Sequence, residues 1–170
     1  METKLKDRQW HVIYTRPKSE RKVASSISEM GIESYLPLHK VVRQWSDRKK
    51  KLEVPLFPNY VFVKVEPADR GYLFSIKEMV RFISVEKKPV IVREKEILAI
   101  KQILNEEVEI SEEEYFQKGM KVRIKQGQFE GLEGVVLKKH GSTRLLIKIE
   151  ALMKAYSFNV STKFAEPIPN

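Results

Sequence analysis

Hydrophobic and polar residues alternate in several short segments of the first hundred residues, which is the pattern of half-buried β-strands. In residues 10–15 (WHVIYT) one strand face carries Trp10, Val12 and Tyr14. In residues 54–65 (VPLFPNYVFVKV) one strand face carries Val61, Val63 and Val65, and the other carries Tyr60, Phe62 and Lys64. Pro55 and Pro58 flank Phe57 and predict an irregular entry to this strand.

Two other segments have helical spacing. After residue 17 an apolar stripe is formed by Val23, Ile27 and Met30. Pro17 suits the first turn of this helix and Gly31 its end. Residues 93–104 repeat the pattern with Ile97, Ile100 and Leu104, so a second helix is expected to close the block.

The segments between these elements predict a hairpin and further strands. Residues 32–44 read as an extended segment that Pro37 interrupts, and the polar run 46–51 (SDRKKK) marks a hairpin tip. Residues 67–71 (PADRG) open a short helix or turn, and 79–85 (MVRFISV) form another strand. The order β-α-β-β-(α)-β-α predicts an α+β fold, an antiparallel sheet with flanking helices.

The two kinds of strand face have different expected environments. The β-branched faces suit burial beneath the helices, which leaves the aromatic faces on the opposite side of the sheet. Such a face either is exposed and binds a partner, or is core beneath another element. The pattern leaves both alternatives open.

The last fifty residues predict a small β-barrel. Residues 119–137 begin with the alternating KVRIK and contain Gly127, Gly131 and Gly134, where glycine permits positive φ and close backbone approach. Three more short strands follow, VVLKK, TRLLIKI and YSFNV. The segment 150–156 (EALMKAY) has good helix propensity, so a helical alternative for this region is also considered.

Charge divides the chain into three parts. Residues 1–104 have a net charge of +9 (22 basic, 13 acidic), residues 105–118 of −5, and residues 119–170 of +5. We therefore expect a domain at 1–105, an acidic linker at 106–118 and a second domain at 119–170, with a solvated helix extension as the alternative for the acidic strip. The overall charge of +9 favours polyanionic partners, chiefly nucleic acid.

Several function classes are excluded or disfavoured. The chain has no Cys, which excludes disulfides, Cys-ligated zinc and a thiol nucleophile. Neither a G-x-S-x-G elbow nor a P-loop, an HExxH motif or a glycine-rich dinucleotide turn occurs, so no enzyme, cofactor or metal site is predicted. No apolar run approaches the roughly 20 residues that span a membrane, and a cytoplasmic protein is expected.

The order of these motifs resembles the NusG family of transcription elongation factors. The residues that carry the resemblance are WHVIYT with its basic helix, PLFPNYVFV, and V-R-I-K-x-G-x-F-x-G-L-x-G-x-V at 122–136, which is similar to a KOW motif. The family's architecture is an N-terminal NGN domain and a C-terminal SH3-like KOW barrel. PLFPNYVFV is more similar to RfaH-type paralogues, the operon-specific antiterminators of surface-polysaccharide clusters.

The resemblance implies a monomeric factor that is not an enzyme. It also implies the following partners and site residues. The clamp helices of RNA polymerase would be bound by Tyr14, Phe57, Tyr60 and Phe62. Non-template DNA or nascent RNA would be contacted by Arg16, Lys18, Arg21, Lys22, Arg43, Arg48, Lys49 and Lys50. Leu152 would contact a ribosomal protein or a termination factor.

Two alternatives remain from the residues alone. The hairpin tip, with Trp45 as a candidate stacking group, either contacts nucleic acid or is merely solvated. The whole chain is alternatively a single-stranded RNA-binding module whose sheet aromatics stack bases.

Overall fold

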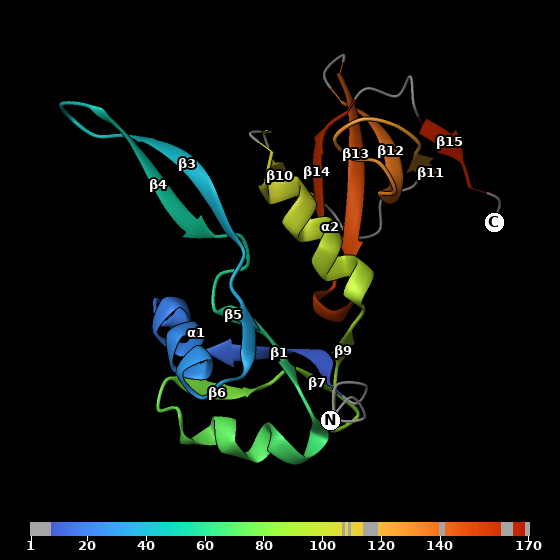
Figure 1. Cartoon of the computed structure of the whole chain (residues 1–170). Helices are drawn as coiled ribbons and strands as arrows, with labels where there is room; N and C mark the ends of the chain where they lie inside the picture. The colour runs from blue at the N-terminus through green and yellow to red at the C-terminus, as the bar shows by residue number, and fades with distance from the viewer. Residues whose placement is uncertain are drawn as a thin grey trace. The chain divides into compact units, whose positions relative to one another are not determined.

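A computed structural model of the chain describes residues 8–106, 108, 110–113, 119–139, 142–160 and 165–168. It divides into two compact units, residues 1–93 and 94–170. Both are built mainly from antiparallel strands (Figure 1), and the predicted α+β class is confirmed. No helix in the described ranges is long and apolar enough to cross a membrane.

The first unit is an antiparallel sheet with a helix, a 3₁₀ segment and a separate ribbon. The sheet order is β2-β5-β1-β6, and β9 also pairs with β1. The elements are β1 (Gln9–Thr15), α1 (Glu20–Glu29), β2 (Glu33–Tyr35), β3 (Leu38–Gln44), β4 (Lys49–Pro55), β5 (Tyr60–Val65), η2 (Pro67–Ser75), β6 (Met79–Phe82), β7 (Ser84–Val85), β8 (Lys88–Pro89) and β9 (Ile91–Val92).

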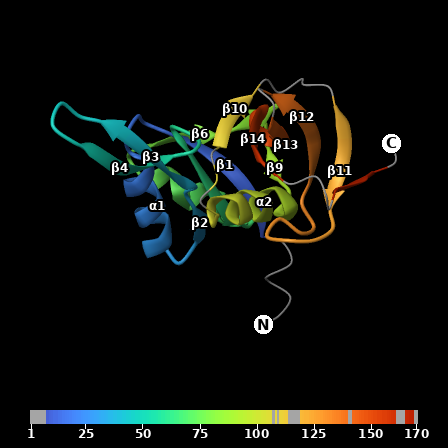
Figure 2. The same ribbon diagram turned by 90° about the horizontal axis from the view of Figure 1, so that it is seen from above.

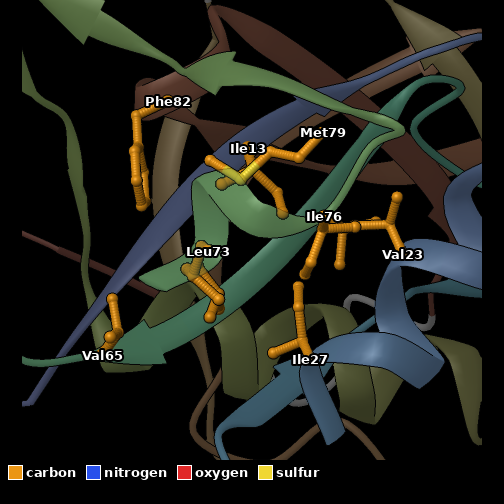
Figure 3. Packing of buried hydrophobic residues seen from close by; sticks show 10 residues of the cluster. Ile13, Val23, Ile27, Val65, Leu73, Ile76, Met79 and Phe82 are labelled. Carbon is orange, nitrogen blue, oxygen red and sulfur yellow. The ribbon is translucent and has the colours of Figure 1, made fainter. Parts of the chain in front are cut away.

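The β-branched face of the sheet forms the core of this unit, as the alternation predicted. Ile13 of β1 and Val61, Val63 and Val65 of β5 cluster with Val23 and Ile27 of α1. Figure 3 shows Val23 and Ile27 pointing from α1 toward Ile76 and Leu73. Each fully buried aliphatic side chain contributes about 1.5–3 kcal/mol, so this layer holds α1 against the sheet.

Helix α1 ends where Gly31 was expected to end it. Gly31 has φ 73°, its N–H bonds to Ser28 O at 2.9 Å, and Ile32 N–H bonds to Ile27 O at 3.2 Å. This is the Schellman arrangement, in which a left-handed glycine closes the last turn. The expected start was wrong, because Lys18 has φ 61° and the helix begins only at Glu20, leaving Pro17 outside.

The second unit is a six-stranded antiparallel sheet with an N-terminal helix. Its strand order is β10-β14-β13-β12-β11-β15, and the four strands predicted from the sequence are all present. The elements are α2 (Glu94–Leu104), β10 (Ile110–Glu113), β11 (Met120–Ile124), β12 (Glu133–Lys139), β13 (Ser142–Ile149), η3 (Glu150–Leu152), β14 (Lys154–Asn159) and β15 (Ala165–Pro167).

Residues 150–156, for which a helix is the alternative, form no α-helix but a 3₁₀ turn followed by the start of a strand. Only Glu150–Leu152 form a single 3₁₀ turn, and β14 begins at Lys154. Tyr156 of β14 pairs with Ile147 of β13. The ladder hydrogen bonds therefore override the helix propensity of this segment.

Two expectations about domain organisation differ from the structure. Helix α2 groups with the second unit rather than closing the first. Its Glu96 carboxylate accepts a hydrogen bond from Glu150 N at 2.9 Å, and the Gln102 amide donates to Gln128 O and Glu130 O at 3.0 and 3.3 Å. Helical periodicity reveals an apolar stripe but does not identify what the helix packs against.

The acidic strip is the second difference. Ile110–Glu113, expected in a linker, form β10 and pair with β14. Ser111 Oγ accepts from the buried Arg144 guanidinium at 3.2 Å. Backbone hydrogen bonds recruit this segment as an edge strand although its side chains have little to bury; residues 107, 109 and 114–118 of the expected linker lie outside the described residues.

A buried histidine of β1 connects this strand to η2 and to the segment between β8 and β9. His11 Nδ1 lies 2.8 Å from Val90 O, and Nε2 lies 2.9 Å from Nη2 of Arg70 in η2. Because a carbonyl only accepts and a guanidinium only donates, the proton sits on Nδ1. Burial, with the positive charge of Arg70 as a smaller cause, lowers the pKa of His11 below 6.5, against the opposing effect of the Val90 carbonyl.

Gly134→Ala is predicted to destabilise the barrel by about 1–3 kcal/mol, the usual cost of overpacking. A Cβ there would collide with Leu146 O and lie 3.0 Å from Leu145 Cγ. Gly71→Ala is the matched control, since no atom lies within 4 Å of its added Cβ. Thermal unfolding followed through amide NMR signals of β12 and β13 measures the difference, and equal melting of both variants would refute it.

Stability of the first unit is predicted to fall as pH drops below 6.5. In the unfolded chain the histidine has its ordinary pKa of 6.5, whereas in the folded protein the pKa of His11 is lower. Below pH 6.5 the unfolded state therefore binds more protons than the folded state, and the free energy of unfolding decreases. The stabilisation by neutral His11 is fully present only above pH 6.5. His11→Gln in a His39→Gln background should flatten this dependence, since burial also lowers the pKa of His39. Urea unfolding monitored by tryptophan fluorescence reports on this unit, which contains Trp10 and Trp45. If the free energy of unfolding depended on pH equally with and without His11, the role given to His11 would be contradicted.

Candidate functional site

Two of the four predicted aromatic residues form a cross-strand pair at one end of the sheet. Tyr14 of β1 lies directly opposite Tyr60 of β5. Their ring centroids are 5.6 Å apart at an interplanar angle of 66°, and both side chains are half-buried. Edge-to-face pairs of this kind are worth about 0.5–1.5 kcal/mol beyond their buried area, so the two rings are fixed on the sheet.

An arginine that the sequence reasoning missed extends this pair onto a third strand. Arg81 of β6 is the register partner of Tyr14 on its other side, and its guanidinium carbon lies 5.8 Å from the Tyr14 ring centroid. We call Arg81, Tyr14 and Tyr60 the tyrosine row. The sequence gives only a weak signal for Arg81, because the adjacent apolar residues Met79 and Val80 break the polar–apolar alternation of this strand.

The other two predicted aromatics are buried. Phe57 is 1% and Phe62 0% exposed, and their rings meet edge to face at 5.4 Å. Trp10, on the same strand face as Tyr14, is also buried. Of the two alternatives that the pattern left open for the aromatic strand faces, the core alternative therefore holds for Trp10 and Phe62. Phe57, which only the family resemblance placed in the polymerase contact, is buried as well. Alternation shows which residues share a face but not whether that face is covered.

A tight turn sets the position of Tyr60. Tyr60 N–H bonds to Phe57 O at 3.1 Å, with Pro58 second in the turn and Asn59 third at φ 69°. These are the features of a type II turn, where Pro pre-sets the second residue and Asn tolerates the left-handed third. The buried Glu20 of α1 accepts from Asn59 N at 2.8 Å, so the helix holds the turn that begins β5.

The basic residues around α1 separate into two groups. Arg21 is near the Glu53 carboxylate at 3.9 Å, and Lys22 contacts Glu78 at 2.5 Å, which lowers the pKa of Glu78. Arg16 and Lys18 are exposed and precede the helix, and within the described residues neither makes an ion pair. The predicted cluster at the helix N-terminus is thus partly neutralised, and Glu20 occupies the first turn.

The predicted hairpin is a two-stranded ribbon of β3 and β4. It extends away from the β1–β5 sheet as an arm in both views (Figure 1, Figure 2). The predicted cations on it, all exposed, are Arg43, Arg48, Lys49 and Lys50. Trp45 is half exposed, and the Lys50 ammonium lies 5.5 Å from its ring centroid.

The predicted partner contact of the barrel lies in η3. Leu152 is half-buried there, and the adjacent Met153, with φ 52°, is exposed. The helix propensity of residues 150–156 gives no signal for Met153, whose exposure follows from the turn that ends η3. Among the side chains that the structure describes, no group of three or more His, Asp or Glu could hold a metal ion.

Together these features define a class of protein: a two-unit α+β protein with an aromatic–cation row, a basic ribbon and a small β-barrel. The family model of NusG, described as transcription termination factor nusG, matches residues 8–101, more than half of the chain. The chain therefore belongs to the NusG family of transcription termination/antitermination proteins, which are not enzymes.

Individual relatives agree with this assignment. The termination/antitermination protein NusG of Pasteurella multocida is 30% identical over 152 residues, covering 79% of this chain and 80% of that protein. NusG of Campylobacter jejuni is 25% identical over 168 residues, covering 92% and 94%. A solved structure titled "Domain interaction in Thermotoga maritima NusG" covers 97% of this chain and 99% of its own, with a TM-score of 0.51 and 23% identity, and supports the fold.

Glu20→Ala is predicted to destabilise the first unit by about 1.5–3 kcal/mol, the value of a hydrogen bond to a charged group. The substitution leaves Asn59 N without its acceptor and loosens the turn before Tyr60. Glu20→Gln keeps a neutral acceptor and should lose less. Urea unfolding by tryptophan fluorescence measures both variants, and a midpoint for Glu20→Ala equal to that of the wild type would remove this role.

Proposed function

We propose that the chain is an elongation and antitermination factor that binds the clamp helices of RNA polymerase through the tyrosine row. The observation that carries this proposal is the fixed pair of half-exposed rings, Tyr14 and Tyr60, on the aromatic strand face of a NusG-family sheet. Bound there, the protein would oppose the opening of polymerase that accompanies pausing and termination. It needs no chemical step.

The physical properties of the row suit a protein partner. Tyrosine supplies a large contact area at a low entropic cost, because its ring has few rotatable bonds and these two are already held against each other. Phe57 and Phe62 meet edge to face behind the surface and support the site rather than touch the partner. Arg81 places a positive charge beside Tyr14, which favours a carboxylate on the partner.

Nucleic acid within the transcription complex is the second proposed partner. Exposed Arg16 and Lys18 and the cations of the β3–β4 ribbon carry this contact to non-template DNA or nascent RNA. Arg21 and Lys22 contribute less, because acidic side chains already lie against them. Phosphate contacts of this type position the protein without reading sequence.

The barrel is proposed to recruit a further protein, a ribosomal protein or a termination factor, at η3. Half-buried Leu152 and exposed Met153 form the apolar part of this contact. Restriction of the factor to particular operons, such as surface-polysaccharide clusters, is proposed from the similarity of PLFPNYVFV to RfaH-type paralogues.

The alternative of an RNA module that stacks bases on its sheet has less support. That mode needs solvent-exposed rings in the middle of the sheet. Trp10 and Phe62, which would serve as its central stacking groups, are 2% and 0% exposed.

The double variant Tyr14→Ala/Tyr60→Ala is predicted to bind purified RNA polymerase at least about tenfold more weakly, the loss expected of aromatic anchors. It should also lose the shortening of a strong transcriptional pause. The matched double variant to Phe keeps both rings and should retain binding. Affinity is measured by titration and pausing by timed transcription with and without the protein; full affinity in the alanine variant, with its fold intact by circular dichroism, would overturn the proposal.

A further inference from the structure

The register of the β3–β4 ribbon continues to its last residues. Arg43 lies opposite Lys50 and Gln44 opposite Lys49. Beyond them Trp45 N–H bonds to Arg48 O at 2.8 Å, so these two residues close the ladder and only Ser46 and Asp47 form the loop. Directly opposed residues of an antiparallel pair lie on one face, which assigns every side chain near the tip to a side.

The two faces of the tip differ in chemistry. The face that we call the tryptophan face carries Arg43, Trp45, Arg48 and Lys50. The opposite face, the lysine face, carries Val42, Gln44, Lys49 and Lys51. The position of the Lys50 ammonium 5.5 Å from the Trp45 centroid agrees with this assignment, because the two residues are diagonal neighbours on one face.

Trp45 lies outside the buried core cluster of the first unit. Its side chain is 50% exposed at the end of an arm, next to a two-residue loop, and all the cations around it are exposed. An aromatic ring among cations is the combination by which proteins hold single strands, since bases stack on the ring while the cations follow the phosphates. In a duplex the base faces are already stacked on one another, so the ring would add little there.

Lys50 favours one orientation of the Trp45 ring before any nucleic acid binds. A cation–π interaction at an exposed site is worth about 0.5–1 kcal/mol, which favours one ring orientation in the free protein. The ammonium lies over one side of the ring, and the side chain is 50% exposed. A stacked base contributes about 1–3 kcal/mol, so it competes successfully even where it must displace the ammonium.

The acidic neighbours do not cancel the charge of the tryptophan face. Asp47 in the loop lies 3.9 Å from Arg48, with both side chains 69% exposed, and solvent screens that pair. Arg43 and Lys50 make no ion pair within the described residues. Two cations thus flank the ring without a competing carboxylate.

We propose that the tryptophan face binds single-stranded nucleic acid, with one unpaired base on Trp45 and its phosphates on Arg43 and Lys50. This rests on the proposed function, whose nucleic-acid contact it assigns to one side of the ribbon and to unpaired strands. The face offers a ring and cations but no group that recognises a base edge or a 2′-hydroxyl. Binding is therefore independent of sequence and similar for RNA and DNA.

The test measures binding of the full-length protein to fluorescent oligonucleotides of about 12 nucleotides, within the range of known single-strand sites. The probes are oligouridine, oligothymidine and a blunt DNA duplex of equal length, each titrated at several salt concentrations. Trp45→Ala should weaken binding of both single strands about five- to a hundredfold, as the loss of one stacked base requires. It should leave duplex binding and the salt dependence unchanged, because no phosphate contact is lost.

Two matched variants test the assignment to one face. Arg43→Ala/Lys50→Ala and Lys49→Ala/Lys51→Ala each remove two positive charges from the same ribbon. The first pair should weaken single-strand binding more than the second, whereas a response to net charge alone would make them equal. Trp45→Phe keeps an aromatic face and should restore most of the affinity that Trp45→Ala loses.

Several results would overturn the proposal. These are equal affinity of Trp45→Ala and wild type for single strands, an equal loss on duplex, no detectable binding at low salt, or binding of RNA alone. The assay contains no polymerase, and Trp45→Ala should bind polymerase without nucleic acid as tightly as the wild type does. Failure here is therefore distinguishable from failure of the tyrosine row.

Discussion

The register of β1 against β5 is the constraint on which the rest of the first unit depends. It puts Ile13, Val61 and Val63 on the face beneath α1 and Tyr14 opposite Tyr60 on the other face. A slip by one residue would exchange the two faces, exposing the aliphatic core and burying the site. The turn at residues 57–60 sets the end of this ladder, and Glu20 of α1 holds the turn, so the core and the proposed polymerase contact have one geometric origin.

The first unit combines a rigid site with a projecting one. The tyrosine row lies within a multi-stranded sheet, where ring contacts and a packed opposite face fix its geometry. The ribbon forms a two-stranded sheet of its own, and its tip is exposed on both faces. Fixed aromatic groups suit a folded protein partner, and a charged arm suits a nucleic acid whose path varies. The proposed polymerase contact thus lies within the sheet, and the proposed nucleic-acid contact lies on the ribbon.

The barrel relies on different physics. Its glycines have specific roles: Gly127 and Gly131 adopt positive φ, and Gly134 lets β12 approach Leu146 of β13. Arg144 is buried and donates to Ser157, Asn159 and Ser111, which ties β10 to the main ladder. Backbone and polar hydrogen bonds thus extend the sheet into an acidic segment with little to bury.

The sequence by itself determined the local structure and the family. Neighbouring residues dictate the local sterics of the chain and the separation of apolar from polar faces. These local effects appear in the sequence as period-two and helical spacing, as the glycines and as the PLFPN turn. Only the tertiary structure decided that Phe57 and Phe62 are buried, that Arg81 joins Tyr14, that β10 pairs with β14 and that α2 groups with the barrel. Each depends on which distant segment covers or pairs with a given face, and a strand presents the same alternation whether its outer face meets solvent or protein.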